Sequence, residues 1–312
     1  MELQRDSSFA KRLQYKARLL RSRDRAHEKI KTVLIVAGGG MEGIFGMGVL
    51  HGLSEAGFLD AFDVVVGISA GACDSAYFLS NQTSLALTVY LEDLIDDRFI
   101  NFHRLSKVVD IDYLENVFRK KKKLDTGAIR KARPDLYFSV TELDGKEKLI
   151  EAKKLDDIIT GLKASMAMPV LYNRKVTIGK EKFVDGGATK PLPVKEIIER
   201  FRPTDVLIVV NEPLDHKDDS ISFLEKMAIK LYLHKFSKRF QEAFLRRNRA
   251  YHHSLHILEN ERLLDGINVN IVAPVRFGVG LITQDPKKLK EEAEEGTRKI
   301  ISIFGISKPR KQ

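Results

Sequence analysis

The stretch Val64-Val65-Val66-Gly67-Ile68-Ser69-Ala70-Gly71 joins an apolar run to residues 70–78, which favour a helix. A G-x-S-x-G between a strand and a helix is typical of a nucleophile elbow, a turn so tight that only glycine fits on either side of the serine. The serine lies over the amino end of the helix, where free N–H groups favour a developing negative charge. Gly67, Ser69 and Gly71 therefore predict an activated serine, a prediction that depends on the motifs around it.

A second glycine cluster precedes this stretch. Residues Thr32–Ala37 form a continuous β-branched and apolar run, which predicts a buried strand of a parallel sheet. The run leads into Gly38-Gly39-Gly40-Met41-Glu42-Gly43 and then into a helical pattern that ends at Gly57. Consecutive glycines at a strand-to-helix junction expose several N–H groups toward one point. We therefore expect an anion cradle, either for a phosphate or for the oxyanion of an acyl-transfer intermediate.

The same cluster allows another interpretation. Gly38, Gly40 and Gly43 satisfy G-x-G-x-x-G, the fingerprint of dinucleotide-binding proteins. That fingerprint requires an acidic residue at the end of the second strand, whereas Asp60 and Asp63 both precede that strand. The oxyanion cradle is favoured, and a dinucleotide-binding enzyme remains a less favoured alternative.

The third motif, Phe183-Val184-Asp185-Gly186-Gly187, reads as a short strand that ends in an aspartate. A Ser–His–Asp triad would need a histidine at a turn late in the chain, and none of the eight histidines is placed there. An aspartate on a glycine-rich turn can itself orient a serine hydroxyl and accept its proton. His252 and His256 are four residues apart but lack an accompanying acidic motif, so we expect no metal site.

Strands and helices alternate along most of the chain. Strands are expected at Thr32–Ala37, Phe62–Gly67, Leu136–Val140, Phe183–Val184, Asp205–Val210 and Asn268–Val272, and helices at positions that include Leu155–Ser165, Val194–Phe201 and Pro286–Phe304. Such alternation predicts a mainly parallel sheet with helices on both faces. The site is then expected at the carboxyl ends of the strands.

The three motifs, in this order, resemble the signatures of the patatin-like phospholipases. Residues 164–169 and 191–194 resemble further segments of that family, and the resemblance extends over about residues 32 to 303. It implies a three-layer α/β/α sandwich with a mainly parallel central sheet. It also implies a lipid acyl hydrolase of the phospholipase A, lysophospholipase or carboxylesterase type, which works through an acyl-enzyme on phospholipid or other acyl-ester substrates without cofactor or metal.

The resemblance also implies a role for each motif position. Ser69 would be the nucleophile and Asp185 its base. The remaining positions are oxyanion-hole amides or turn-forming glycines: the amides of Gly38, Gly39, Gly40 and Ala70, and the turns at Gly43, Gly67, Gly71, Gly186 and Gly187.

Glu42 departs from the family pattern, which usually has a basic residue at that position. If Glu42 pointed at the oxyanion hole, a like charge at about 5 Å would cost about 3 kcal/mol at an effective dielectric of about 20. We favour the interpretation that Glu42 faces solvent from the first turn of a helix, where an acid is favourable. The alternative is a catalytically weakened patatin-fold protein that binds a lipid or a partner.

The resemblance implies a patatin-like catalytic domain at residues 32–312, and the basic segment before it, residues 1–31, is expected to be a helical extension. The chain has 312 residues and no Pro/Gly/Ser-rich linker. Its single cysteine, Cys73, excludes an internal disulfide and favours a reducing compartment. We find no secretory signal and no transmembrane run, and therefore expect a cytoplasmic protein.

The chain is basic, with 53 Lys and Arg against 43 Asp and Glu, a net charge of +10. The excess is concentrated at residues 11–25, at Arg119–Lys123 and at Phe223–Arg249, where apolar and basic residues alternate. The last stretch predicts a long amphipathic helix that packs on the sheet. These segments are either solvated faces or contacts to an anionic membrane surface. No nucleic-acid-binding signature accompanies them, so no nucleic-acid partner is expected.

Overall fold

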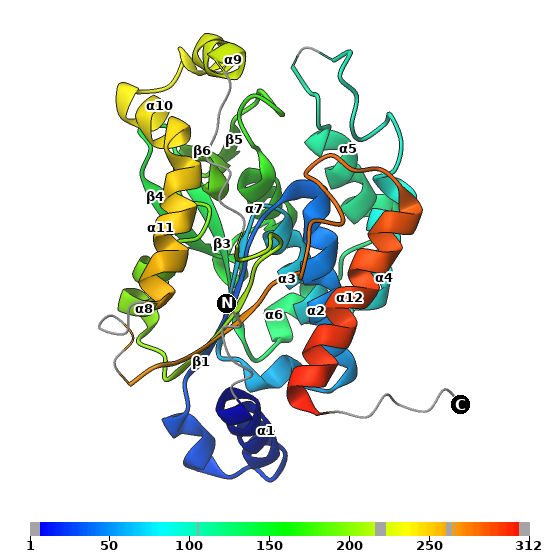
Figure 1. Cartoon of the computed structure of the whole chain (residues 1–312), viewed down its shortest axis with the longest axis vertical. Helices are drawn as coiled ribbons and strands as arrows, with labels where there is room; N and C mark the ends of the chain where they lie inside the picture. Colours follow the sequence, from blue (N-terminus) through cyan, green and yellow to red (C-terminus); the bar gives the residue numbers. More distant parts are fainter. Residues whose placement is uncertain (1–6, 105, 216–222, 260–263, 265, 306–312) are drawn as a thin grey trace.

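A computed structural model describes residues 7–104, 106–215, 223–259, 264 and 266–305 (Figure 1). Within these residues, eight strands form one sheet in the order β5-β6-β3-β2-β1-β7-β8, with β4 also paired to β3. The strands are β1 (Thr32–Val36), β2 (Val64–Ile68), β3 (Asp135–Glu142), β4 (Glu147–Glu151), β5 (Val176–Ile178), β6 (Glu181–Asp185), β7 (Asp205–Val209) and β8 (Asn268–Val272).

The centre of the sheet is parallel. Strands β3, β2, β1, β7 and β8 pair in parallel, whereas β4, β5 and β6 pair antiparallel. Every residue of β1, β2 and β7 is buried, as their continuous apolar sequences require. The mainly parallel sheet predicted from the sequence is therefore confirmed, and the carboxyl ends of its parallel strands lie at one edge.

Helices cover both faces of the sheet and make the three layers. Their bounds are α1 (Ser7–Arg21), α2 (Gly43–Glu55), α3 (Ala70–Leu79), α4 (Thr83–Thr88), α5 (Ile111–Asn116), α6 (Thr126–Lys131), α7 (Ile158–Met166), α8 (Val194–Phe201), α9 (Phe223–Leu233), α10 (Lys238–Leu245), α11 (Arg247–Glu259) and α12 (Pro286–Phe304). Helices α2, α3, α7 and α12 share one apolar core with one face of the sheet, and α8 and α11 cover the other face. Within the described ranges, no helix has the length and apolar character needed to cross a bilayer.

Two strands end head to head beside β3. Ile68, the last residue of β2, pairs with Ser139, and Asp185, the last residue of β6, pairs with Val140. Strand β4 occupies the opposite edge of β3, so β2 and β6 share one edge and approach each other from opposite directions. This register brings Ser69 and Asp185 together although 116 residues separate them.

Helix α1 lies at the opposite, amino edge of the sheet. Arg12 Nε donates to Asp205 Oδ1 over 2.6 Å at the start of β7. Lys16 is fully buried and pairs with Asp63, which directly precedes β2. Burial lowers the pKa of Lys16, and the ion pair with Asp63 opposes this effect. Several basic residues of the amino-terminal segment thus hold the helix against the sheet, far from its carboxyl edge.

One expectation about the helices was wrong, and two strands were missed. Residues 223–249 do not form one long helix on the sheet, because the helix ends at Leu233 and Ser237 caps a new one by accepting from the Phe240 N–H. Helices α9 and α10 pack over Val184 at the end of β6, and only α11 lies on the sheet. Strands β4 and β5 were not predicted from the sequence, because β4 (EKLIE) is rich in charge and β5 (VTI) has only three residues.

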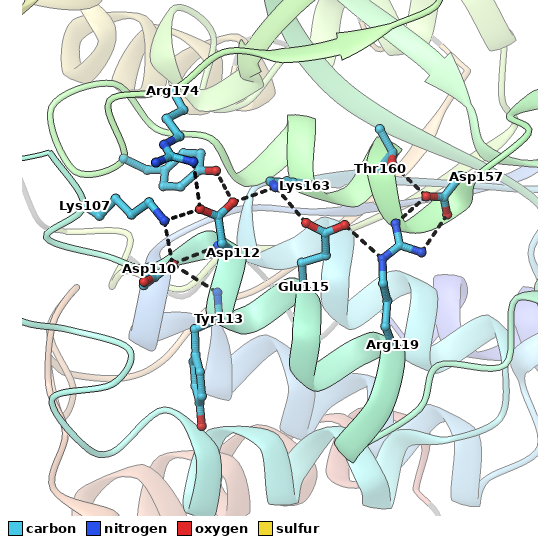
Figure 2. A network of polar contacts seen from close by, with 11 residues as sticks. Lys107, Asp110, Asp112, Tyr113, Glu115, Arg119, Asp157, Thr160, Lys163 and Arg174 are labelled. Atoms are coloured by element: carbon cyan, nitrogen blue, oxygen red, sulfur yellow. Dashed lines mark hydrogen bonds and ion pairs between the residues drawn. The ribbon is translucent and has the colours of Figure 1, made fainter.

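A polar network joins α5 and the π-helical turn after it (Val117–Lys121) to α7 (Figure 2). Lys163 on α7 donates to Asp112 over 2.6 Å and to Glu115 over 2.7 Å. Arg119 forms ion pairs with both Glu115 and Asp157, and Asp157 is the N-cap of α7. These charged residues lie on the outside of the two helices, while the opposite sides of the same elements turn apolar residues inward.

Candidate active site

Ser69 and Asp185 form a hydrogen-bonded pair at the carboxyl edge of the sheet. Ser69 Oγ donates to Asp185 Oδ2 over 2.6 Å. Asp185 Oδ1 accepts from the Gly187 N–H over 2.8 Å, which fixes the carboxylate plane. Asp185 is fully buried, and burial raises its pKa to about 7 although both hydrogen bonds act to lower it. A carboxylate with this pKa is a much better base than an exposed aspartate.

The turn that carries Ser69 is strained and closely packed. Ser69 has φ 54° and ψ −123°, a backbone conformation that is costly for a residue with a side chain. A Cβ on Gly67 would lie 2.4 Å from Ala72 Cα, and one on Gly71 would lie 2.3 Å from Val36 O, so neither position has space for a side chain. The Ser69 N–H donates to Ser165 Oγ over 3.2 Å, which supports the strained turn from α7.

The glycine loop lies beside this serine. A Cβ on Gly38 would be 2.8 Å from Ser69 Cβ, so the loop and the elbow are in direct contact. Within the described part of the chain, the N–H groups of Gly38, Gly39 and Gly40 have no hydrogen-bond acceptor. Ala70 begins α3, so its N–H also has no acceptor within that helix. The Gly38 and Ala70 amides lie beside Ser69, and the Gly39 and Gly40 amides follow in the same glycine loop.

Asn211, two residues after the end of β7, orients the glycine loop. Its Nδ2 donates to the carbonyls of Ala37 and Gly38 over 3.0 and 2.8 Å, and its Oδ1 accepts from the Gly46 N–H over 3.0 Å. In a trans peptide the N–H points away from the carbonyl. Asn211 therefore turns the N–H groups of Gly38 and Gly39 away from itself.

The remaining motif glycines allow close approach of these segments. Gly186 packs against Ser139, where a Cβ would lie 2.2 Å from Ser139 Oγ. Gly43 begins α2 and packs between Ala70 and Tyr90, where a Cβ would lie 2.6 Å from Tyr90 Oη.

A cavity of about 550 Å³ opens above Ser69. Its apolar wall includes Tyr77, Ala86, Val89, Leu94, Phe99, Ile100, Leu114, Phe118, Met166, Ile229 and Phe244. Its polar lining includes Glu42, Asp74, Tyr90, Asn211, Glu212, Arg247, Asn248, Tyr251 and His252. Leu114 and Phe118 line the cavity, and Glu115 and Arg119 on the same segment belong to the polar network of Figure 2. The network therefore holds this part of the apolar wall in place from outside the cavity.

Glu42 is buried beside the glycine loop, so the interpretation that it faces solvent was wrong. Only 9% of Glu42 is exposed, and its Oε2 lies 3.0 Å from the position of a Cβ on Gly39. Burial and the nearby carboxylates of Glu212 and Glu292 raise its pKa to about 8, whereas a hydrogen bond from the Leu281 backbone acts to lower it. At pH 7 Glu42 is therefore mainly neutral, and the like charge considered from the sequence is largely removed.

Two residues that support the site were not found from the sequence. Asn211 follows the apolar run of β7 at the carboxyl edge, a position at which a polar residue is a weak signal of a site. Ser165 lies inside a run of small residues on α7, and nothing in the sequence indicates that its hydroxyl supports the elbow.

Among the described residues, no histidine is hydrogen-bonded to Ser69 or Asp185. His252 lines the cavity from α11, and His51 bonds Thr83 Oγ1 on the far side of α2. Within the described ranges, no three His, Cys, Asp or Glu side chains are grouped closely enough to share a metal ion. Cys73 is buried in the cavity wall, with its thiol 3.3 Å from Met166 Sδ.

Comparison with known proteins identifies the family of this chain. The family model of the patatin-like phospholipases matches residues 34–198, just over half of the chain. The chain therefore belongs to the patatin-like phospholipase family, a class of lipid acyl hydrolases.

Individual relatives are more distant. The chain is 28% identical over 184 residues to the uncharacterized protein YjjU of Escherichia coli K12, a match that covers 57% of this chain and 51% of YjjU. The chain thus spans about half the length of this curated relative. Among solved structures, VipD from Legionella pneumophila is similar with a TM-score of 0.44 and 12% identity, over 88% of this chain and 67% of VipD.

The burial of Glu42 leads to a prediction about stability. Folding raises the pKa of Glu42 from 4.5 to about 8, so the folded state retains a proton that the unfolded state has lost between these pH values. This side chain should therefore reduce stability as the pH rises from 4.5 to 8, by at most about 1.4 kcal/mol per pH unit. Glu42→Gln should be stabilised relative to wild type, with a difference that grows from pH 5 to pH 8. Urea denaturation of both proteins at several pH values measures this difference in the free energy of unfolding. A difference that does not change with pH would contradict a raised pKa of Glu42.

Proposed function

We propose that this protein is a lipid acyl hydrolase in which Ser69 is the nucleophile and Asp185 the base. The observation that carries the proposal is the 2.6 Å hydrogen bond from Ser69 Oγ to a buried aspartate at the floor of a largely apolar cavity. Membership of the patatin-like phospholipase family supports an ester bond of a lipid as the substrate.

In the first step, Ser69 Oγ attacks the ester carbonyl while Asp185 Oδ2 accepts the hydroxyl proton. The carbonyl oxygen becomes an oxyanion, which the amides of Gly38, Gly39 and Gly40, together with that of Ala70, are available to bind. When the tetrahedral intermediate collapses, Asp185 gives its proton to the departing alcohol or lysolipid. The acyl group then remains on Ser69 as an ester.

In the second step, water hydrolyses this acyl-enzyme. Asp185 accepts a proton from the water as it attacks, and returns a proton to Ser69 Oγ when the fatty acid leaves. One carboxylate thus acts as base and then as acid in each half of the reaction. A pKa near 7 suits both roles, because neither protonation state is then costly at neutral pH.

Helix α3 supports a direction for the acyl chain. Ala70, Cys73 and Tyr77 line the cavity and recur at helical spacing on one face of α3. Seven residues of helix span about 10 Å, so this face extends two turns from the serine. The apolar wall continues beyond it, which supports a medium-length or long acyl chain as the occupant.

The alternative is a patatin-fold protein that binds a lipid or a partner without turnover, as the acidic residue at position 42 suggested. A mainly neutral Glu42 weakens that alternative, because a neutral carboxyl does not oppose the oxyanion.

Covalent labelling tests the serine and its base. An alkyl fluorophosphonate should add once to the wild-type protein and not to Ser69→Ala, as read by intact mass. Asp185→Asn should lose at least about a thousandfold in kcat on p-nitrophenyl octanoate, since Ser69 then has no base. Ser75→Ala, a buried serine on the same helix that does not line the cavity, is the matched control and should label normally. An unlabelled, folded wild type would favour the binding protein instead.

The two raised carboxyl pKa values predict a narrow pH optimum. Hydrolysis should rise with pH through about 7, because Asp185 must be ionised to act as base. It should fall above about 8, where Glu42 ionises beside the glycine loop and opposes the oxyanion. In Glu42→Gln the fall above pH 8 should disappear while the rise near pH 7 remains. A pH profile of kcat/KM for both proteins measures this, and an unchanged alkaline limb would exclude Glu42 as its cause.

We also propose that the rim of the cavity contacts an anionic lipid surface. Large apolar side chains exposed by at least 41% gather on three segments that also line the cavity: Phe102, Met227, Leu231, Val275, Phe277, Leu281 and Ile282. Lys226 and Lys230 are exposed on α9 among them, whereas α1 lies at the opposite edge of the sheet (Figure 1). An apolar rim with basic neighbours fits anionic headgroups.

This proposal is tested with vesicles. Lys226→Glu/Lys230→Glu should weaken binding to anionic vesicles by tenfold or more, since each basic residue near the surface contributes about 1 kcal/mol. Arg18→Glu/Arg21→Glu changes the charge equally on α1 and should bind like wild type. Equal losses in both variants, measured by co-sedimentation, would mean that net charge alone attracts the protein and would remove the rim as a docking face.

A further inference from the structure

A polar pair interrupts the apolar wall of the cavity. Asp74 lies on the same face of α3 as Ala70 and Tyr77, and all three residues line the cavity. Tyr90, which also lines it, donates from Oη to Asp74 Oδ1 over 3.0 Å. Asp74 is 1% exposed and Tyr90 5% exposed. A carboxyl group and a phenol are thus buried where an acyl chain would otherwise meet only apolar side chains.

One oxygen of Asp74 is unsatisfied. Asp74 Oδ2 is buried and has no hydrogen-bond partner within the described part of the chain. Leaving a buried polar atom without a partner costs about 1–3 kcal/mol. Burial raises the pKa of Asp74 well above its ordinary value, which favours the neutral carboxylic acid, a form that can donate as well as accept. The mechanism proposed above makes no use of this group.

The pair lies close to the reacting carbonyl. Asp74 follows Ala70 by four residues, a rise of about 6 Å along the helix. A Cβ on Gly43 would lie 2.9 Å from Ala70 Cβ and 3.4 Å from Asp74 Oδ2, so a single methyl position touches both. If the Ala70 amide holds the oxyanion, Asp74 meets the first few carbons of an acyl chain that runs along α3.

We propose that Asp74 and Tyr90 form a subsite for a hydroxyl group on the acyl chain near its carbonyl, and thus that hydroxyacyl esters are preferred substrates. This inference rests on the proposed function, because it assigns the acyl group of that reaction. A hydroxyl suits the subsite because it accepts a hydrogen bond from a carboxylic acid and donates one to a carboxylate. An unsubstituted chain leaves Asp74 Oδ2 without a partner.

Discrimination between an acyl chain with a hydroxyl and one without it can be large. A site built to hydrogen-bond a substrate hydroxyl rejects the analogue without it much more strongly than an apolar pocket rejects an extra methylene. The expected preference is at least tenfold in kcat/KM.

The test compares p-nitrophenyl 3-hydroxyoctanoate with p-nitrophenyl octanoate, each rate normalised to its hydroxide-catalysed hydrolysis. Wild type should prefer the hydroxylated ester by tenfold or more. In Asp74→Leu this ratio should fall to about one, and in Asp74→Asn, which can still hydrogen-bond, it should remain above that of Asp74→Leu. Thermal melting and fluorophosphonate labelling show that each variant is folded with a reactive serine.

Asp93→Asn is the matched control. Asp93 is also fully buried with an unpartnered Oδ2, and it pairs with Lys121, but it does not line the cavity. Its substitution should leave the ratio unchanged. Equal wild-type rates on the two esters would overturn the inference, because a hydroxyl bound by Asp74 and Tyr90 must favour the ester that carries it. Hydrolysis of neither ester by folded protein would instead reject the proposed function, so the two failures are distinct.

Discussion

The hydrogen bond between Ser69 and Asp185 depends on how two strands end on a third. Because β2 and β6 share one edge of β3 and point at each other, their last residues pair with neighbouring positions, Ser139 and Val140. A shift of the β6 register by one residue would turn the Asp185 side chain to the other face of the sheet. The sheet pairing thus brings the two residues of the 2.6 Å contact together, and the turn after β2 then orients Ser69.

Burial determines the charge of the site as well as its shape. Asp185 contacts Ser69 and Glu42 lies beside Gly39 of the glycine loop, and loss of solvent raises the pKa of each carboxyl group. The carboxylates of Glu212 and Glu292 act to raise the pKa of Glu42 further, whereas two hydrogen bonds act to lower the pKa of Asp185. Environment alone therefore separates two carboxyl groups into one that ionises first and one that stays neutral.

Local signals in the sequence predicted the fold and the members of the candidate site. Gly67 and Gly71 could be assigned because a turn without space for side chains leaves a glycine pattern in the sequence. The direction in which the Glu42 side chain points could not be predicted from the sequence. It depends on a hydrogen bond with the backbone of Leu281, which is distant in the sequence. Asn211 was missed for the same reason, because a single amide after a strand has no pattern of its own. The catalytic roles of Ser69 and Asp185 stay predictions.

The charge of the chain has different uses at the two edges of the sheet. On α1, Arg12 and Lys16 form ion pairs with Asp205 and Asp63 at the amino ends of the strands. Their positive charges are therefore balanced within the fold. On α9, Lys226 and Lys230 are exposed. Met227 and Leu231 are exposed beside them, although both are large apolar side chains. Leaving large apolar side chains in water is unfavourable unless a surface covers them. A surface at this edge would face the mouth of the cavity, where a lipid substrate would enter.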